Sequence, residues 1–203
     1  MKDYKNLTID DGTILVKTAR MVVTEYLKNG LKPILKNEFK SNFSFKSGVF
    51  VTLNDSFGLR GCIGYPLPNK LLFNALEDAA IAAATEDPRF PPVKNSEINS
   101  ITFEVTVLTT PKKIIVNDFH EYPSKIKVGK DGLIIKYGFY SGLLLPQVPI
   151  EYGWNEEEFL EHVCEKAGLS KDHWKNPETE IQKFEGIVFK EKSPNGFVIR
   201  EVL

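Results

Sequence analysis

The sequence predicts an α+β fold, a mainly antiparallel sheet with about three main helices packed on it. Segments with helical periodicity are mixed with segments rich in β-branched and aromatic residues, without a regular strand–helix alternation. The hairpin-type turn signals at 129–132 and 195–196 indicate antiparallel neighbours. A length of 203 residues, with 42% hydrophobic and 26% charged side chains, is ordinary for one globular domain.

The first expected helix runs from about residue 9 to residue 28. Thr8 and Asp11 have the spacing of a capping box, in which a hydroxyl and a carboxylate satisfy free N–H groups of the first turn. Asn29-Gly30 then supplies a helix stop.

Two strands and a second helix are expected next. The segment GVFVTL (48–53) is rich in β-branched and aromatic residues, and LRGCIG (59–64) follows it after a polar turn. The helix begins after Asn69, a good N-cap residue, and ends before Asp87-Pro88, because proline disfavours helix in the residue before it. The segment EDPRFPPV (86–93) is then a loop stiffened by three prolines.

The second half of the chain predicts further strands and a third helix. Asn155 caps this helix and Gly168 ends it. The expected strands lie in ITFEVTVLTT (101–110), in KIIV (113–116), on both sides of Gly129–Gly132 within 125–138, in GLLL before Pro146, and in a C-terminal hairpin over 184–203. We treat residues 1–203 as a single domain with a soft subdomain boundary near 110–125.

Composition and charge argue against several classes of protein. A net charge of −1 without a cluster of basic and aromatic residues argues against nucleic-acid binding. No apolar run reaches the ~18 residues of a membrane span, and the N-terminus lacks a secretory signal, so we expect a cytoplasmic protein with no membrane partner. The two cysteines suggest a reducing compartment, and no metal-binding motif is present.

The LRGCIG segment is the first candidate site. On an extended chain Arg60 and Cys62 share one side, and a nearby guanidinium favours the reactive thiolate of a cysteine. Gly61 and Gly64 would let a ligand, or another backbone, approach closely. The alternative is a buried cysteine that acts as a small hydrophobe in a strand ending at a turn.

Three residues outside this segment are further candidates. Arg89, on the proline-braced loop, either binds a carboxylate or phosphate or forms a salt bridge with Asp87 or Glu86. Glu104 is a general base or a partner of an arginine, unless its side of the strand is solvated. Gln147 orients a polar ligand group or ties down turn backbone.

The chain resembles the AMMECR domain family. The resemblance rests on an ordered set of segments: FVTL (50–53), LRGCIG (59–64), DPRF (87–90), EVTVL (104–108), GLLLPQV (142–148) and WNEEEFLEHVCEKAGL (154–169). It implies an α+β fold with a larger and a smaller subdomain, and a cleft lined by the signature segment, for which a catalytic role has been suggested. Relatives often occur beside Memo-like and radical-SAM proteins, which implies such a protein as a partner. The resemblance supplies no reaction and no cofactor.

Two hypotheses about function remain open. In the first, the protein is an enzyme that uses Cys62 as nucleophile or acid/base, with Arg60 and Arg89 binding an anion and Glu104 or His162 handling protons. In the second, the same cleft is a non-catalytic binding module for a small molecule, a peptide or a Memo-like or radical-SAM partner. A thiol pKa at or above the free value would count against the first hypothesis.

Overall fold

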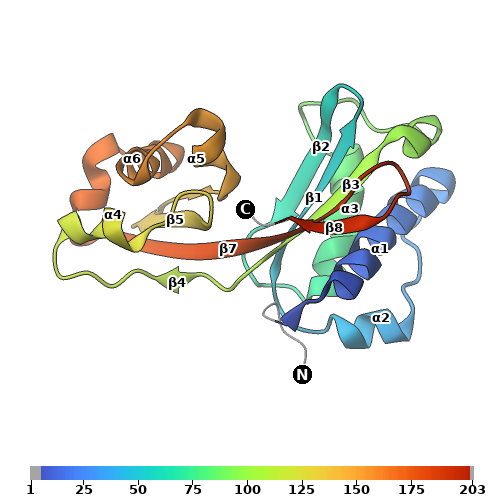
Figure 1. Cartoon of the computed structure of the whole chain (residues 1–203), viewed down its shortest axis with the longest axis horizontal. Coiled ribbons are helices and arrows are strands. Elements are labelled where there is room, and N and C mark those ends of the chain that lie inside the picture. Colours follow the sequence, from blue (N-terminus) through green and yellow to red (C-terminus); the bar gives the residue numbers. More distant parts are fainter. Residues whose placement is uncertain (1–5, 202–203) are drawn as a thin grey trace. The chain divides into compact units, whose positions relative to one another are not determined.

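The computed structural model describes residues 6–201, which form two compact units. The first unit contains the described residues up to Thr109 and those from Ile187 onward, and the second contains Thr110–Gly186 (Figure 1). Antiparallel strands and helices occur together in the chain, so the α+β class is confirmed. In the described part of the chain, no helix combines the length and the apolar character needed to cross a bilayer.

The first unit is a sheet with helices packed against it. Its strand order is β2-β1-β3-β7, and β8 also pairs with β7. Helix α3 packs on β1 and β2, and α1 packs on α3, β3 and β8. The bounds are α1 Ile9–Asn29, α2 Asn37–Asn42, β1 Gly48–Asp55, β2 Gly58–Tyr65, α3 Leu72–Thr85, the 3-10 helix η2 Asn95–Ser100, β3 Thr102–Leu108, β7 Glu180–Glu191 and β8 Val198–Glu201.

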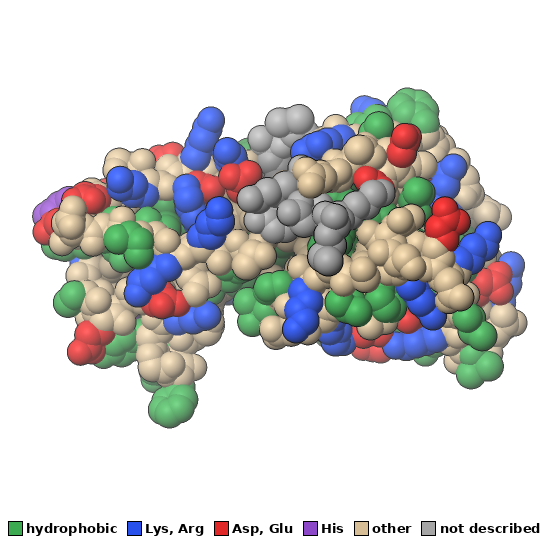
Figure 2. Space-filling model, turned by 90° about the horizontal axis from the view of Figure 1, so that it is seen from below, with side chains coloured by type: hydrophobic (Ala, Val, Ile, Leu, Met, Phe, Trp, Pro, Cys, Tyr) green, Lys and Arg blue, Asp and Glu red, His purple; other side chains and the backbone are tan. Residues whose placement is uncertain are grey.

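Charged side chains of both signs are interspersed on the face shown in Figure 2. Lysine and arginine side chains there lie beside aspartate and glutamate side chains, without a continuous basic area. This distribution agrees with the near-zero net charge of the sequence.

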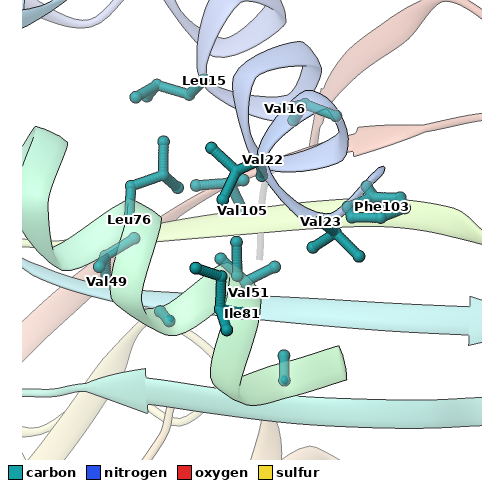
Figure 3. Packing of buried hydrophobic residues seen from close by; sticks show 14 of the residues in the cluster. Leu15, Val16, Val22, Val23, Val49, Val51, Leu76, Ile81, Phe103 and Val105 are labelled. Atoms are coloured by element: carbon teal, nitrogen blue, oxygen red, sulfur yellow. The ribbon is translucent and has the colours of Figure 1, made fainter. Parts of the chain in front are cut away.

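The core of the first unit lies between the helices and one face of the sheet. Val49, Val51 and Leu53 of β1 are fully buried, and they alternate with half-buried residues along the strand. Figure 3 shows side chains of α1 and α3 meeting those of β1 and β3 in this layer. The alternation leaves the other face of each strand turned away from α1 and α3.

Helix starts follow capping chemistry only in part. The predicted capping box of Thr8 and Asp11 is present, and Gly30 ends α1 in the left-handed conformation (φ 70°). The predicted start of the second helix at Asn69 is wrong, because α3 begins after Leu71 without a side-chain cap. The Leu72 N–H instead donates to the Phe45 carbonyl at 2.8 Å, so tertiary contact replaces the cap.

The second unit contains strands β4, β5 and β6 and has a core of its own. Strands β4 and β5 pair with β7, and β5 pairs with β6. The side chains of Phe159, Leu160, Val163 and Cys164 from α6 pack with Leu133 and Ile135 of β5 in one cluster. The bounds are β4 Lys112–Lys113, η3 Phe119–Glu121, α4 Tyr122–Lys125, β5 Asp131–Tyr137, β6 Tyr140–Leu144, α5 Gln147–Tyr152, α6 Glu156–Lys166 and η4 Lys171–Lys175.

The hairpin predicted around 129–132 is wrong. Residues 126–130 form a turn rather than a strand, and the hairpin connection lies between Tyr137 and Tyr140. The Asp131 carboxylate closes the earlier turn by accepting from the Lys127 N–H at 2.9 Å, with Gly129 at φ 82°. The predicted strand over 113–116 is likewise reduced to the short β4.

The C-terminal hairpin is confirmed over its described part. Strands β7 and β8 pair from Val188 to Glu191, and Asn195 occupies the left-handed region (φ 59°) in the turn. Residues 202–203 of the predicted hairpin lie outside the described residues.

Candidate functional site

Cys62 lies on β2, at the edge of the first unit's sheet. The residue before it, Gly61, faces α3 so closely that a Cβ there would lie 2.1 Å from the Ala83 carbonyl oxygen. Because neighbouring residues of a strand point to opposite faces, Cys62 points away from α1 and α3. The sequence left open whether Gly61 admits a ligand or another backbone. The group that approaches Gly61 is the backbone of α3.

Cys62 belongs to a row of polar side chains across three strands. Thr52 of β1 is in register with Cys62 on one side and with Glu104 of β3 on the other. The Thr52 hydroxyl and the Cys62 thiol are 3.2 Å apart and share a hydrogen bond. We call Cys62, Thr52 and Glu104 the polar row.

A carboxylate and a guanidinium hold the backbone of Cys62 at the sheet edge. Asp87 Oδ2 accepts from the Cys62 N–H at 2.8 Å, and Arg89 Nη2 donates to the Cys62 carbonyl at 3.3 Å. Arg89 also binds Asp87 twice, through Nε to Oδ1 at 3.0 Å and Nη2 to Oδ2 at 2.7 Å. The salt bridge left open by the sequence is thus formed, with Asp87 as the partner of Arg89.

The two members of this pair differ in exposure. The Asp87 side chain is 2% exposed and that of Arg89 is 55% exposed. The Arg89 guanidinium holds the pKa of Asp87 well below its usual range, helped by the N–H groups of Cys62 and Arg89. Arg89 Nη1 has no partner among the described residues, so this nitrogen is free to meet an anion.

Arg60 is occupied by other partners. Its Nε donates to Glu97 Oε1 at 2.9 Å, and its Nη1 donates to the Pro91 carbonyl at 2.9 Å. Glu97 belongs to η2 and Pro91 to the proline-rich loop, so Arg60 fixes both segments to β2. The sequence predicted that the Arg60 guanidinium lies beside the Cys62 thiol, but it binds Glu97 and the Pro91 carbonyl instead.

Burial keeps the Cys62 thiol protonated. Removal from water raises its pKa above the ordinary cysteine value, and this outweighs the Thr52 hydrogen bond and the Arg89 charge, which act in the opposite direction. The negative charges of Glu104 and Asp87 raise the pKa further. The expectation that Arg60 would favour the thiolate is therefore wrong for this residue.

Glu104 is a half-buried carboxyl group with an elevated pKa. Burial is the main cause, Lys190 opposes it, and Glu201 adds to it. Lys190 itself forms an ion pair with Glu201 at 2.5 Å. No described residue donates a hydrogen bond to the Glu104 carboxyl, and neither Arg60 nor Arg89 pairs with it as the sequence allowed.

The remaining two sequence candidates have different surroundings. A Cβ on Gly64 would lie 2.4 Å from the Phe50 ring, so this glycine accommodates an aromatic side chain of the neighbouring strand. Gln147 is the first residue of α5 in the second unit, and its buried Oε1 has no hydrogen-bond partner in the described structure. The polar row and Gln147 thus belong to different units.

Sequence reasoning missed two residues of the site. The sequence indicates Thr52 only as part of a strand, since the register that pairs it with Cys62 is not visible in one sequence. The sequence suggests Asp87 only as a salt-bridge partner, although it also accepts a hydrogen bond from the Cys62 backbone. Among residues 6–201, no group of three potential metal ligands is close enough to hold an ion.

Comparison with known proteins places the chain in a family. The family model named AMMECR1 matches residues 16–189. Protein MJ0810 of Methanocaldococcus jannaschii is 51% identical over 199 residues, covering 97% of this chain and 98% of the relative. A protein of Methanocella arvoryzae is 49% identical over 197 residues, covering 96% and 98%.

A solved structure is also similar. The crystal structure titled as that of uncharacterized protein PH0010 from Pyrococcus horikoshii has a TM-score of 0.87 and 48% identity, and the match covers 95% of this chain and 97% of that chain. The ordered LRGCIG and DPRF segments, the two-unit α+β architecture and these matches agree. The chain belongs to the AMMECR1 family.

Proposed function

We propose that the polar row binds a small polar molecule, and that Cys62 contributes a neutral thiol to this binding rather than a nucleophile. The proposed ligand carries a hydrogen-bond donor for Glu104 and an acceptor near Thr52 and Cys62. An anionic group on the ligand would reach the free nitrogen of Arg89. The main support for this proposal is the Glu104 carboxyl group, which has an elevated pKa and no hydrogen-bond donor among the described residues.

The surroundings of the Glu104 carboxyl group support a ligand that donates a hydrogen bond to it. A carboxyl group that is partly removed from water is stabilised by a hydrogen-bond donor or a cation. Glu104 has no such partner among the described residues, and burial raises its pKa. Perturbed carboxyl groups of this kind are concentrated at functional sites. A ligand donor, such as an amine or amide group, would satisfy it.

The thiol supports a binding role for Cys62. Nucleophilic catalysis needs the thiolate, which an elevated pKa disfavours at neutral pH. A protonated thiol beside the Thr52 hydroxyl instead offers a weak donor and two acceptors within one small area. The enzymatic hypothesis then depends on Glu104, whose elevated pKa suits proton transfer, and not on Cys62.

A peptide, or a Memo-like or radical-SAM partner, is the alternative occupant. A peptide that extended the sheet at β2 would need the outward N–H and carbonyl of Cys62. Asp87 and Arg89 already bind both groups, so strand addition is blocked at this position. A protein partner would have to contact the side chains of the polar row, which favours a small molecule.

Protection of Cys62 from alkylation tests the proposal. The full-length protein is treated with iodoacetamide at pH 9, with and without fractions of a small-molecule cell extract, and labelling is located by peptide mass spectrometry. We expect one fraction to slow alkylation of Cys62 at least several-fold. The Glu104→Gln variant, which keeps the shape of the side chain, should lose this protection, whereas Glu86→Gln should keep it.

Two outcomes would overturn the proposal. The first is the absence of protection by any fraction. The second is a Cys62 that reacts at pH 7 faster than a free cysteine, which would restore the nucleophile hypothesis. Cys164 is an internal control because it is fully buried and burial raises its pKa to about 11.

A further inference from the structure

A groove lies between α1 and the segment that leads into α2, in the first unit. Its volume is about 550 Å³. Ile14 and Met21 of α1 line one wall, and Ile34 lines the other. Figure 1 shows α1 and α2 joined by the linker that contains Ile34. The groove is distinct from the polar row, which faces away from α1.

The walls of this groove are apolar side chains left in contact with water. Ile14 is 42% exposed, Met21 is 39% exposed and Ile34 is 93% exposed. Ile14 and Met21 are seven residues apart, so they lie on the same side of α1, two turns from one another. Contiguous exposed apolar area on a folded protein marks a binding surface more often than isolated apolar residues do.

The floor of the groove consists of buried core side chains. Leu35 and Phe39 line it, and both are buried members of the first unit's core cluster. Phe39 also packs against Phe43, with ring centroids 4.9 Å apart. A ligand in the groove would therefore lie on core side chains that are already ordered, which lowers the entropic cost of binding.

Two lysines supply charge at the groove. Lys17 and Lys36 line it, and neither forms an ion pair with a described residue. Glu38 also lines the groove, so the three charged side chains leave a net positive charge. A positive charge beside an apolar groove complements a molecule with an apolar body and one anionic end.

From these observations we infer that the groove binds a small amphipathic anion, a free molecule with a hydrocarbon body and a single carboxylate or similar group. Its volume falls within the range of roughly 300–1,000 Å³ typical of small-molecule sites. The wall from Ile14 to Met21 is about 10 Å long at 1.5 Å per residue. This length fits a medium-length chain and is short for a partner helix, whose anchors extend over several turns.

Calorimetric titration with decanoate, below the concentration at which it forms micelles, tests the inference. We expect saturable binding of one decanoate per wild-type chain. Ile34→Glu should weaken it at least tenfold, because it places a carboxylate in the apolar wall; at 93% exposure the change leaves the core untouched. Leu31→Glu is the matched control: Leu31 is 73% exposed in the same linker and does not line the groove, so affinity should not change.

The charge of the ligand is tested separately. The double variant Lys17→Gln, Lys36→Gln should bind decanoate several-fold more weakly than wild type. Decyltrimethylammonium, which has the same hydrocarbon chain and the opposite charge, should bind wild type more weakly than decanoate does. Equal binding of the two compounds would overturn the assignment of an anionic ligand.

Results of three kinds would overturn the groove as a small-molecule site. One is the absence of saturable decanoate binding, or unchanged binding in Ile34→Glu. Another is a dimer in sedimentation that Ile34→Glu converts to a monomer, which would make the groove an interface between copies. The third is wild-type protein that pellets with phosphatidylglycerol vesicles while Ile34→Glu does not, which would assign the groove to a lipid surface. None of these depends on the polar row.

Discussion

Cys62 shows how burial and a weak hydrogen bond compete at one side chain. Desolvation raises the pKa of the thiol, and the Thr52 hydroxyl lowers it by bonding to the charged form. The first effect is larger, so the thiol is neutral at physiological pH. The Thr52 hydroxyl and the Arg89 charge favour the thiolate, so they raise the rate at which Cys62 reacts. They do not make Cys62 a nucleophile at pH 7.

The Thr52→Val variant should react more slowly with iodoacetamide at pH 8 than wild type does. Valine keeps the shape of threonine but removes the hydroxyl that stabilises the thiolate, so the pKa of Cys62 moves further up. Thr102→Val is the control, because this threonine donates to the Asn54 carbonyl and does not contact Cys62. Faster alkylation in Thr52→Val would show that the hydroxyl limits the access of iodoacetamide to Cys62 and does not lower the pKa of its thiol.

Strand β2 is held on two sides by different kinds of contact. Gly61 brings its backbone against α3, and the Asp87–Arg89 pair binds its outer edge at Cys62. Arg60 adds a third attachment, through Glu97 and the Pro91 carbonyl. An edge strand normally exposes unpaired backbone groups that attract other strands. Here the proline-rich loop covers them at the position of the candidate site.

Gly61→Ala should destabilise the protein by about 1–3 kcal/mol, the usual cost of overpacking. The added methyl group would lie 2.1 Å from the Ala83 carbonyl oxygen, so β2 and α3 must move apart. Urea unfolding measures the change. Leu59→Ala, on the same strand at a position that is 41% exposed, should cost much less. Equal costs would contradict the close packing of β2 on α3.

Asp87→Asn should destabilise the fold by ~1–2 kcal/mol at pH 7, a modest value because Arg89 is largely exposed and solvent screens its charge. The pKa of Asp87 is depressed in the folded state. Its contribution is therefore full above the unfolded aspartate pKa of about 3.9 and is lost as the pH falls through the folded value.

Urea midpoints of wild type and Asp87→Asn, measured from pH 7 down to pH 3, test this dependence. The difference between the two proteins should be constant from pH 7 to pH 5 and should shrink below pH 4. Glu86→Gln, at the exposed neighbouring position, should show no such trend. A difference that grew in acid would mean that the Asp87 charge is unfavourable in the folded protein.

At the scale of the whole molecule, the chain builds two separate hydrophobic cores. One contains side chains of α1, α3, β1 and β3, and the other contains side chains of β5 and α6 with Trp174. Strand β7 contributes to both, through Phe189 in the first and Ile181 in the second. Local stability need not be uniform in such a protein, because each core supports its own elements.

Phe159→Ala should therefore loosen the second unit selectively. The side chain is fully buried in the α6–β5 core, and its truncation should cost about 3–5 kcal/mol of local stability. Hydrogen exchange read by mass spectrometry should rise in β5 and α6 and remain nearly unchanged in α3 and β1. Uniform acceleration along the chain would instead show that the two units unfold as one.

The sequence predicted local elements better than the contacts between them. The capping box at Thr8 is a signal of adjacent residues, and it was confirmed. The start of α3 and the turn at Gly129 were misjudged, because distant groups, the Phe45 carbonyl and the Lys183 side chain bound to Asp131, take part in them. The partners of Arg60 were missed for the same reason, since Glu97 lies 37 residues away.

Arg20 of α1 and Glu191 of β7 form a buried ion pair, and this pair has a consequence for synthesis of the protein. The two residues are 171 positions apart, and Glu191 also accepts the Phe103 N–H. At ribosomal rates of about 5–20 residues per second, Arg20 emerges on the order of ten seconds or more before its carboxylate partner exists. The first unit therefore lacks the Glu191 carboxylate and the β7 strand beside β3 until the intervening 77-residue unit Thr110–Gly186 has been translated, and until then, of the partners of Arg20 in the described structure, only the Ile98 and Ile101 carbonyls can accept from it.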